Sequence, residues 1–81
     1  MRKFQKPRIV KGDFTQIDLQ EVFKSHGFLI WDDVFICDKA ERSKIQFGIE
    51  KGYVALYPLE SCKENVIKKV IHILEKSEEN V

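Results

Sequence analysis

Three aspartates near the middle of the chain are the residues best suited to hold a metal ion. Asp32, Asp33 and Asp38 offer hard carboxylate oxygens, the kind of ligand that magnesium prefers. A metal-dependent enzyme would also need a positioned base and a basic group to hold a phosphate. His26 and His72 fall in different predicted helices, and nothing in the sequence brings them together. Metal-dependent catalysis by the three aspartates is therefore only the third of the functions that we consider.

The usual catalytic and cofactor-binding motifs are missing from the sequence. It contains no H-x-x-x-H, no paired C-x-x-C, no P-loop and no G-x-G-x-x-G. The two cysteines, Cys37 and Cys62, do not make a disulfide framework and are expected to be free thiols in a reduced, cytoplasmic protein. These observations favour a non-catalytic protein, with no catalytic residue, metal or cofactor predicted.

Membrane insertion and secretion are not expected either. No apolar run approaches the roughly 20 residues that a membrane helix needs. The basic start of the chain has no apolar block behind it, so it does not read as a secretory signal. We expect no membrane partner.

The pair Asp32-Asp33 interrupts the most hydrophobic segment of the chain, LIWDDVFIC at 29–37. In one continuous strand each face of the sheet would bury an unpaired carboxylate, which is costly. A break is cheaper, so a turn or a bulge is predicted here. A two-residue loop would pair Trp31 with Val34, and a wider turn or a bulge would serve equally well.

The sequence predicts a helix on each side of a group of strands. The first helix has Asp18 as its cap with Glu21 three residues later, and Thr15 with Asp18 offers a competing start. The last helix has Ser61 as its cap and an apolar stripe over about four turns. Apolar and β-branched runs predict strands at 28–31, 34–37, 44–50 and 53–57, and a short edge strand is possible at 8–11.

These elements predict one α+β domain with helices on one face of a small antiparallel sheet. The sheet has three or four strands, in the order (β)-α-β-β-β-α. Residues 1–12 form a basic N-terminal arm, residues 13–77 the domain, and residues 78–81 a frayed C-terminus. With 81 residues, of which 43% are hydrophobic, one small core is all that the chain can build.

Aromatic residues predict a surface that binds another protein. If Val54 and Leu56 face the helices, Tyr53 and Tyr57 face the other way, with Trp31 or Phe35 beside them. Exposed aromatics are the usual anchors of protein interfaces. The first hypothesis is therefore a small non-catalytic regulator or inhibitor that binds another protein, or itself as a homodimer, through this aromatic face and the acidic section of the chain. Its predicted binding residues are Trp31, Phe35, Tyr53, Tyr57, Asp32 and Asp33.

Basic residues support nucleic-acid binding as the alternative. Residues 1–11 carry five basic side chains and no acid, whereas residues 12–38 carry six acids against Lys24 alone. The last helix adds lysines on the side opposite its apolar stripe; such a stripe is usually a solvated face, and otherwise a phosphate contact surface that works with the basic arm. The predicted contacts are Arg2, Lys3, Lys6, Arg8, Lys11, Lys68, Lys69 and Lys76.

Overall fold

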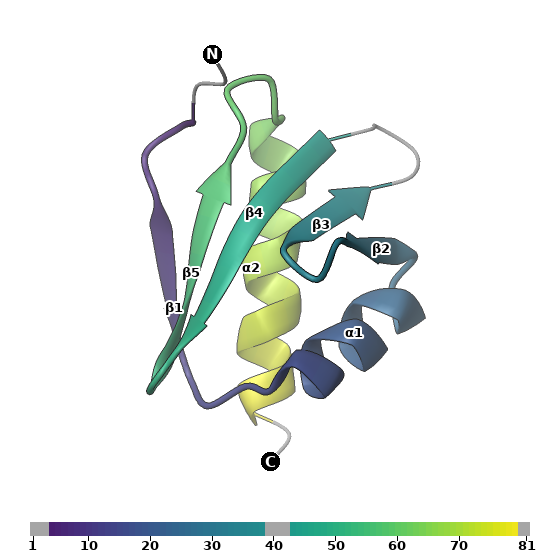
Figure 1. Cartoon of the computed structure of the whole chain (residues 1–81), viewed down its shortest axis with the longest axis vertical. Coiled ribbons are helices and arrows are strands. Elements are labelled where there is room, and N and C mark those ends of the chain that lie inside the picture. Colours follow the sequence, from purple (N-terminus) through teal and green to yellow (C-terminus); the bar gives the residue numbers. More distant parts are fainter. Residues whose placement is uncertain (1–3, 39–42, 80–81) are drawn as a thin grey trace.

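The chain folds as β-α-β-β-β-β-α in a computed structural model that describes residues 4–38 and 43–79 (Figure 1). The two helices are α1, Gln16–Ser25, and α2, Glu64–Glu79. The strands are β1, Arg8–Lys11; β2, Phe28–Trp31; β3, Phe35–Asp38; β4, Ser43–Glu50; and β5, Tyr53–Pro58. No helix in these described ranges is both long and apolar enough to cross a membrane.

All five strands join one antiparallel sheet in the order β1-β5-β4-β3-β2. The α+β class is therefore confirmed, but the predicted count of three or four strands is wrong. The edge strand considered possible at 8–11 is present as β1, and four strands rather than three follow α1; β1 pairs along β5 from Arg8 with Leu56 to Lys11 with Tyr53. This pairing joins segments more than forty residues apart, so no local sequence pattern predicts it.

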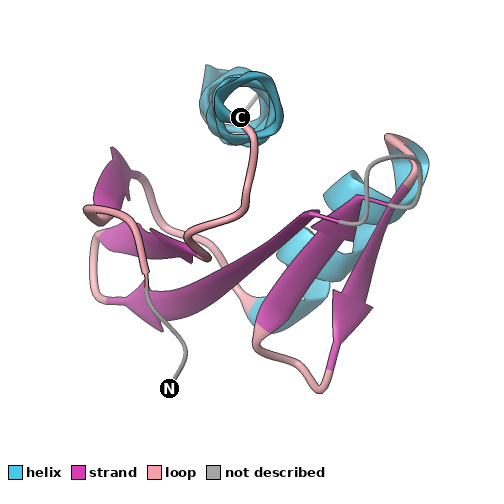
Figure 2. Cartoon of the chain, turned by 90° about the horizontal axis from the view of Figure 1, so that it is seen from above, coloured by secondary structure: helices cyan, strands magenta, loops and turns pink. Residues whose placement is uncertain are grey.

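The strand register divides the sheet residues between two faces. Val10, Val54 and Ile49 lie side by side across β1, β5 and β4, and all point to the face that the helices cover. Phe28 belongs to the same face and lies against both helices. Its ring centroid is 5.8 Å from that of Phe23 in α1, and the Lys69 Nζ of α2 is 5.7 Å from it. Both helices therefore cover one face of a bent sheet (Figure 2).

The core fills the space between the helices and this face. Its largest fully buried side chains come from α1, β3, β4, β5 and α2, and they include Phe23, Leu19, Ile36, Ile45, Leu56, Ile67 and Leu74. The alternation of β4, in which Ile45 and Phe47 are buried and Gln46 is not, is typical of a strand with one covered face. The regularly spaced apolar side chains of α2 pack into the same core.

Both helices start at other residues than the first choice from the sequence. Thr15 caps α1: its Oγ1 accepts the Asp18 N–H at 3.1 Å, and the Asp18 carboxylate accepts the Thr15 N–H at 3.1 Å. The competing start is thus the correct one, and Asp18 is the third residue of the helix rather than its cap. For α2 the cap prediction is wrong, because the helix begins at Glu64 and Ser61 lies in a turn before it.

The turn around Ser61 is fixed by a contact from the N-terminal segment. The Gln5 side-chain amide donates to the carbonyl oxygens of Leu59 at 3.1 Å and Cys62 at 2.7 Å. Phe4 pairs with Leu59, and the Gln5 N–H donates to the Pro58 carbonyl at 2.8 Å. The described part of the basic arm is therefore attached alongside the end of β5. Arg2 and Lys3 lie outside the described residues.

Candidate functional site

The face of the sheet that no helix covers, hereafter the helix-free face, collects the aromatic residues. One row of neighbours, Trp31, Phe35, Gln46 and Tyr57, crosses four strands from β2 to β5. The strand register gives this face the apolar side chains of Ile9, Leu29, Trp31, Phe35, Tyr53 and Tyr57. All four predicted aromatics therefore share one surface.

Large apolar side chains on this face are exposed to solvent. Trp31 is 49% exposed, and Tyr53 and Tyr57 are 38% and 39% exposed. Ile9 at 58% and Leu29 at 38% extend the apolar surface toward the two sheet edges. Scattered exposed apolar residues are ordinary, but several on one face of a sheet form a surface suited to a partner.

Two small residues beneath this surface are buried. Ala55 lies between Ile9 and Gly48 and is 2% exposed, and Cys37 lies between Leu29 and Lys44 and is 8% exposed. Because both residues face the side without helices and are still buried, the side chains of this face must pack over them. Such packing keeps the anchors in place before a partner arrives.

Lys44 is part of the helix-free face and contacts its tryptophan. The Lys44 Nζ lies 4.6 Å from the centroid of the Trp31 ring. The lysine comes from β4 and reaches past β3 to the indole on β2, a cation–π arrangement. The remaining charged groups on this face are Lys11 and Glu50, which flank Tyr53. The surface is therefore apolar with both signs of charge, rather than uniformly basic.

Asp32 and Asp33 border this surface in the turn between β2 and β3. Both have left-handed backbone conformations, with φ of 50° and 60°, and the Val34 N–H donates to the Trp31 carbonyl at 3.0 Å. The turn is as predicted, and of the alternatives it is the wider one: Trp31 pairs with Phe35 across a connection of three residues, and not with Val34. The longer connection puts Phe35 beside Trp31 on the helix-free face.

Two glutamines of α1 hold this turn. The Gln16 Nε2 donates to the Asp33 carbonyl oxygen at 3.0 Å, and the Gln20 Nε2 donates to Asp33 Oδ1 at 3.2 Å. Gln16 and Gln20 are four residues apart and so point the same way from the helix. Asp33 is therefore tied to α1, and both aspartates of the turn are exposed.

The three aspartates considered as metal ligands do not meet. Asp32 and Asp33 lie at one end of the β2–β3 hairpin, whereas Asp38 pairs with Phe28 at the other end. Four residues of strand separate the two ends, which is about 13 Å. Among the described residues, no group of three or more histidine, cysteine, aspartate or glutamate side chains is placed to hold a metal.

The residues of the nucleic-acid hypothesis are spread over different surfaces. Arg8 points to the helix side and forms a bidentate ion pair with Glu64, with N–O distances of 3.1 Å and 3.4 Å. Lys11 points to the helix-free face, and Lys69 lies over Phe28. Lys6, Lys68 and Lys76 are exposed. The described members of the set do not form one continuous basic patch.

Sequence reasoning missed Ile9, Leu29 and Lys44 as members of the helix-free face. Leu29 carried a signal, because it is two residues from Trp31 and side chains alternate along a strand. Ile9 carried no such signal, since its face depends on the pairing of β1 with β5.

No protein-family model matches the chain, and no curated protein or solved structure is significantly similar to it.

Proposed function

We propose that this chain is a non-catalytic protein-binding domain, a small regulator or inhibitor, that docks on another protein through its helix-free face. One observation carries the proposal: five large apolar side chains on that face, Ile9, Leu29, Trp31, Tyr53 and Tyr57, are each at least 38% exposed. Exposing them to water is unfavourable, and a partner that covers them recovers this free energy. Tryptophan and tyrosine also head the residue types that dominate binding energies.

The charges on this face favour a protein over a nucleic acid as its partner. A base-stacking surface needs a positively charged groove that follows the phosphates. Here Lys11 and Lys44 are accompanied by Glu50, and Lys44 already contacts Trp31. Asp32, exposed at the rim, would repel a phosphate backbone. A protein surface with an apolar centre and mixed charges at its margin fits this pattern better.

Pull-down from a lysate of the source cells, with and without nuclease, tests the proposal. The wild-type chain should retain a protein that survives nuclease treatment. Trp31→Ser combined with Tyr57→Ser should weaken its binding by more than about tenfold, because each side chain is a central anchor. Ile17→Ser is the matched control, since Ile17 is 66% exposed but lies on α1, away from this face.

The outcomes separate the alternatives. Unchanged binding by the double variant, with the fold retained by circular dichroism, would reject the helix-free face as the binding surface. A purified protein that sediments as a dimer, and as a monomer after Trp31→Ser, would identify the partner as a second copy. A purified wild-type protein that stays monomeric directs the search to a different protein.

Nucleic-acid binding remains the second candidate because of the exposed lysines of α2. Lys68, Lys69 and Lys76 all reach solvent on the helix side of the sheet, opposite the aromatic surface. This candidate predicts that nucleic acid co-purifies with the chain and that affinity falls steeply with added salt. Replacing the three lysines by glutamine should then remove the nucleic acid, whereas Trp31→Ser should not.

A further inference from the structure

The two edges of the sheet differ in how they are protected from other strands. Free strand edges expose unpaired backbone groups, and proteins usually guard them with lysine, proline or another charge. The β1 edge follows this rule, because Pro7 precedes it and it contains Arg8 and Lys11. The β2 edge has the sequence FLIW, with no proline and no charged residue. It is an apolar edge, and no strand of residues 4–38 or 43–79 pairs with its outer side.

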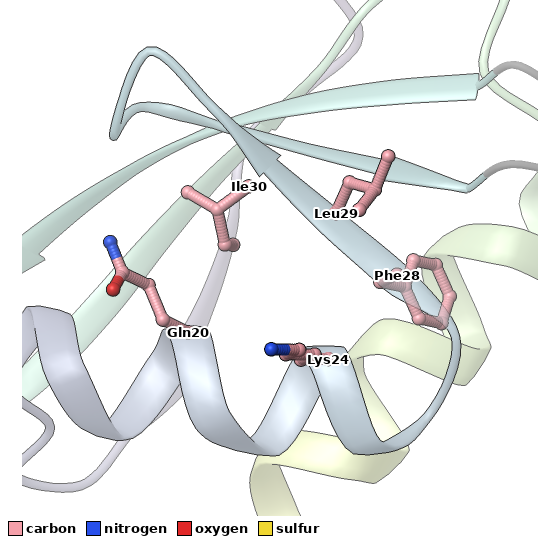
Figure 3. A pocket seen from close by; sticks show the side chains of 5 residues that line it. All are labelled: Gln20, Lys24, Phe28, Leu29 and Ile30. Carbon is pink, nitrogen blue, oxygen red and sulfur yellow. The ribbon is translucent and has the colours of Figure 1, made fainter.

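A pocket lies along this open edge, between β2 and α1 (Figure 3). Its volume is about 200 Å³, and it is lined by Gln20, Lys24, Phe28, Leu29 and Ile30. Leu29 points to the opposite face of the sheet from Phe28 and Ile30. A pocket that touches all three must therefore lie at the free edge of the strand and not over one face.

The size of the pocket suits a side chain of a bound segment. Sites for small-molecule ligands commonly have volumes of about 300–1,000 Å³, so this pocket is small for one. Its floor is apolar, with Phe28 and Ile30, and its rim carries the polar ends of Gln20 and Lys24. A glutamate side chain matches this arrangement, because its methylene groups would pack on the floor while its carboxylate reached the lysine.

Two lysines, Lys24 and Lys69, lie at the pocket, and one carboxylate reaches it: Asp33 Oδ1 accepts from the Gln20 Nε2 at 3.2 Å. Lys24 forms no ion pair with any described residue, and the Lys69 Nζ lies 5.7 Å from the ring centroid of Phe28 at one end of the pocket. None of the five lining residues is acidic. Asp38, the acid nearest in register, is on β3 and so on the side of Phe28 away from the free edge.

We propose that the free edge of β2 binds an extended acidic peptide segment of a partner protein, which adds a sixth strand to the sheet. Main-chain hydrogen bonds to β2 would supply affinity, and alternate side chains would supply specificity. Side chains on the helix side would be acidic, to meet Lys24. Those on the other side would be apolar, to lie beside Leu29. The site shares Leu29 and Trp31 of β2 with the helix-free face, but it uses the strand edge and Lys24 and does not depend on the function proposed above.

A second copy of the chain fits this edge less well. Antiparallel pairing of two β2 strands would place a two-fold axis at the centre of the strand, beside the pocket. The same axis would bring the two Lys24 side chains together, and like charges at an interface oppose binding. An acidic segment from a different protein makes the opposite, favourable contact.

Selection from a random octapeptide library displayed on phage tests the proposal. Wild-type protein should enrich peptides in which glutamate or aspartate alternates with apolar residues. The synthetic peptides should bind Lys24→Glu at least about fivefold more weakly, since an attraction becomes a repulsion. Lys24→Gln should show a smaller loss in the same direction. Lys51→Glu is the matched control, because it makes the same charge change in the exposed β4–β5 turn.

Amide hydrogen exchange measured by NMR locates the bound peptide. Binding should slow exchange at those amides of Phe28–Trp31 that point away from β3, and N-methylation of the peptide should abolish it. The proposal is overturned if no peptide is enriched over a protein-free control, or if the selected peptides bind wild type and Lys24→Glu equally. It is also overturned if the peptide slows amide exchange around Tyr53 and Tyr57 but not in β2. A free protein that is a dimer, with the β2 amides already protected, would overturn it too.

Discussion

At the scale of single residues, Asp32 shows how a local conflict in the sequence is resolved by backbone conformation. A charged pair inside an apolar segment signals a turn, and the two positive φ angles show why aspartate is tolerated there. Aspartate and asparagine adopt the left-handed conformation more readily than other residues with a Cβ, because their short side chains can bond locally. The identity of the turn was predictable from these residues, whereas its length was not.

The backbone conformation of Asp32 gives the first prediction. Asp32→Val should lower the free energy of unfolding by about 1–2 kcal/mol, because a β-branched side chain resists a φ of 50°. Asp32→Gly should cause no such loss, since glycine accepts positive φ. Asp13→Val is the control: it removes the same charge from an exposed residue whose φ is not positive. Urea denaturation of the three variants measures the effect, and equal losses for both valine variants would contradict it.

The two cysteines give a second prediction at this scale. Cys37 is 8% exposed and Cys62 is 5% exposed, so a thiol reagent must wait for the structure to open. Both should react with 5,5′-dithiobis(2-nitrobenzoic acid) at least about tenfold more slowly in native buffer than in denaturant. The thiol introduced by Lys51→Cys, in an exposed turn, should react at once and serves as the control. A fast reaction of two thiols in the wild-type protein would contradict the burial.

At the scale of elements, the spacing of apolar residues and the composition were enough to identify helices and strands. The residues that cap the helices were harder to predict. The strands of the β4–β5 hairpin follow from alternation within a few residues, and their register follows from a short turn. Helix starts depend on which of several hydrogen-bonding side chains is used. Thr15 and Asp18 compete within one turn of α1, and the carbonyls near Ser61 are bonded instead to Gln5, which is distant in sequence.

These helix starts give a third prediction. Thr15→Ala should lower the free energy of unfolding by about 1 kcal/mol, because it removes the acceptor for the Asp18 N–H. Ser61→Ala should change it by less than about 0.5 kcal/mol, because α2 begins at Glu64 and Ser61 is exposed. Both residues carry a hydroxyl group and both precede a helix, so the two variants are comparable. Urea denaturation measures the free energy of unfolding of each. A cost for Ser61→Ala as large as that for Thr15→Ala would show that Ser61 acts as a cap.

At the scale of the whole molecule, what the sequence left open is the long-range pairing. The order β1-β5-β4-β3-β2 depends on contacts between residues 8–11 and 53–56, which no local pattern specifies. The faces of Tyr53 and Tyr57 were predictable, since both lie on one strand with Val54 and Leu56. That Trp31 and Phe35 share one face could not be predicted, because it depends on the length of the turn between them. That β2 is an edge strand could not be predicted either, because it depends on the strand order.

The same pairing gives the last prediction, which concerns the N-terminal segment. Deleting residues 1–11 should lower the free energy of unfolding by more than about 3 kcal/mol, which few single changes reach. The deletion removes β1 with Val10, which is 4% exposed, and Gln5, whose amide bonds the Leu59 and Cys62 carbonyls. The partly buried carbonyls of Leu59 and Cys62 lose their donor, which adds its own cost. Lys6→Gln with Lys11→Gln removes charge but keeps the strand, and should change stability by less than about 0.5 kcal/mol.

The two variants also decide how the nucleic-acid hypothesis can be examined. A loss of binding on deleting the segment would report unfolding and not a lost phosphate contact, because β1 is an edge of the core sheet. The double glutamine variant removes the two exposed lysines Lys6 and Lys11 from an intact fold, so a weaker salt dependence of its binding would implicate those charges. Urea denaturation and dispersed ¹⁵N–¹H NMR spectra establish which variants are folded. A deletion variant as stable as the wild type would show that β1 contributes little to the sheet, contrary to the pairing described.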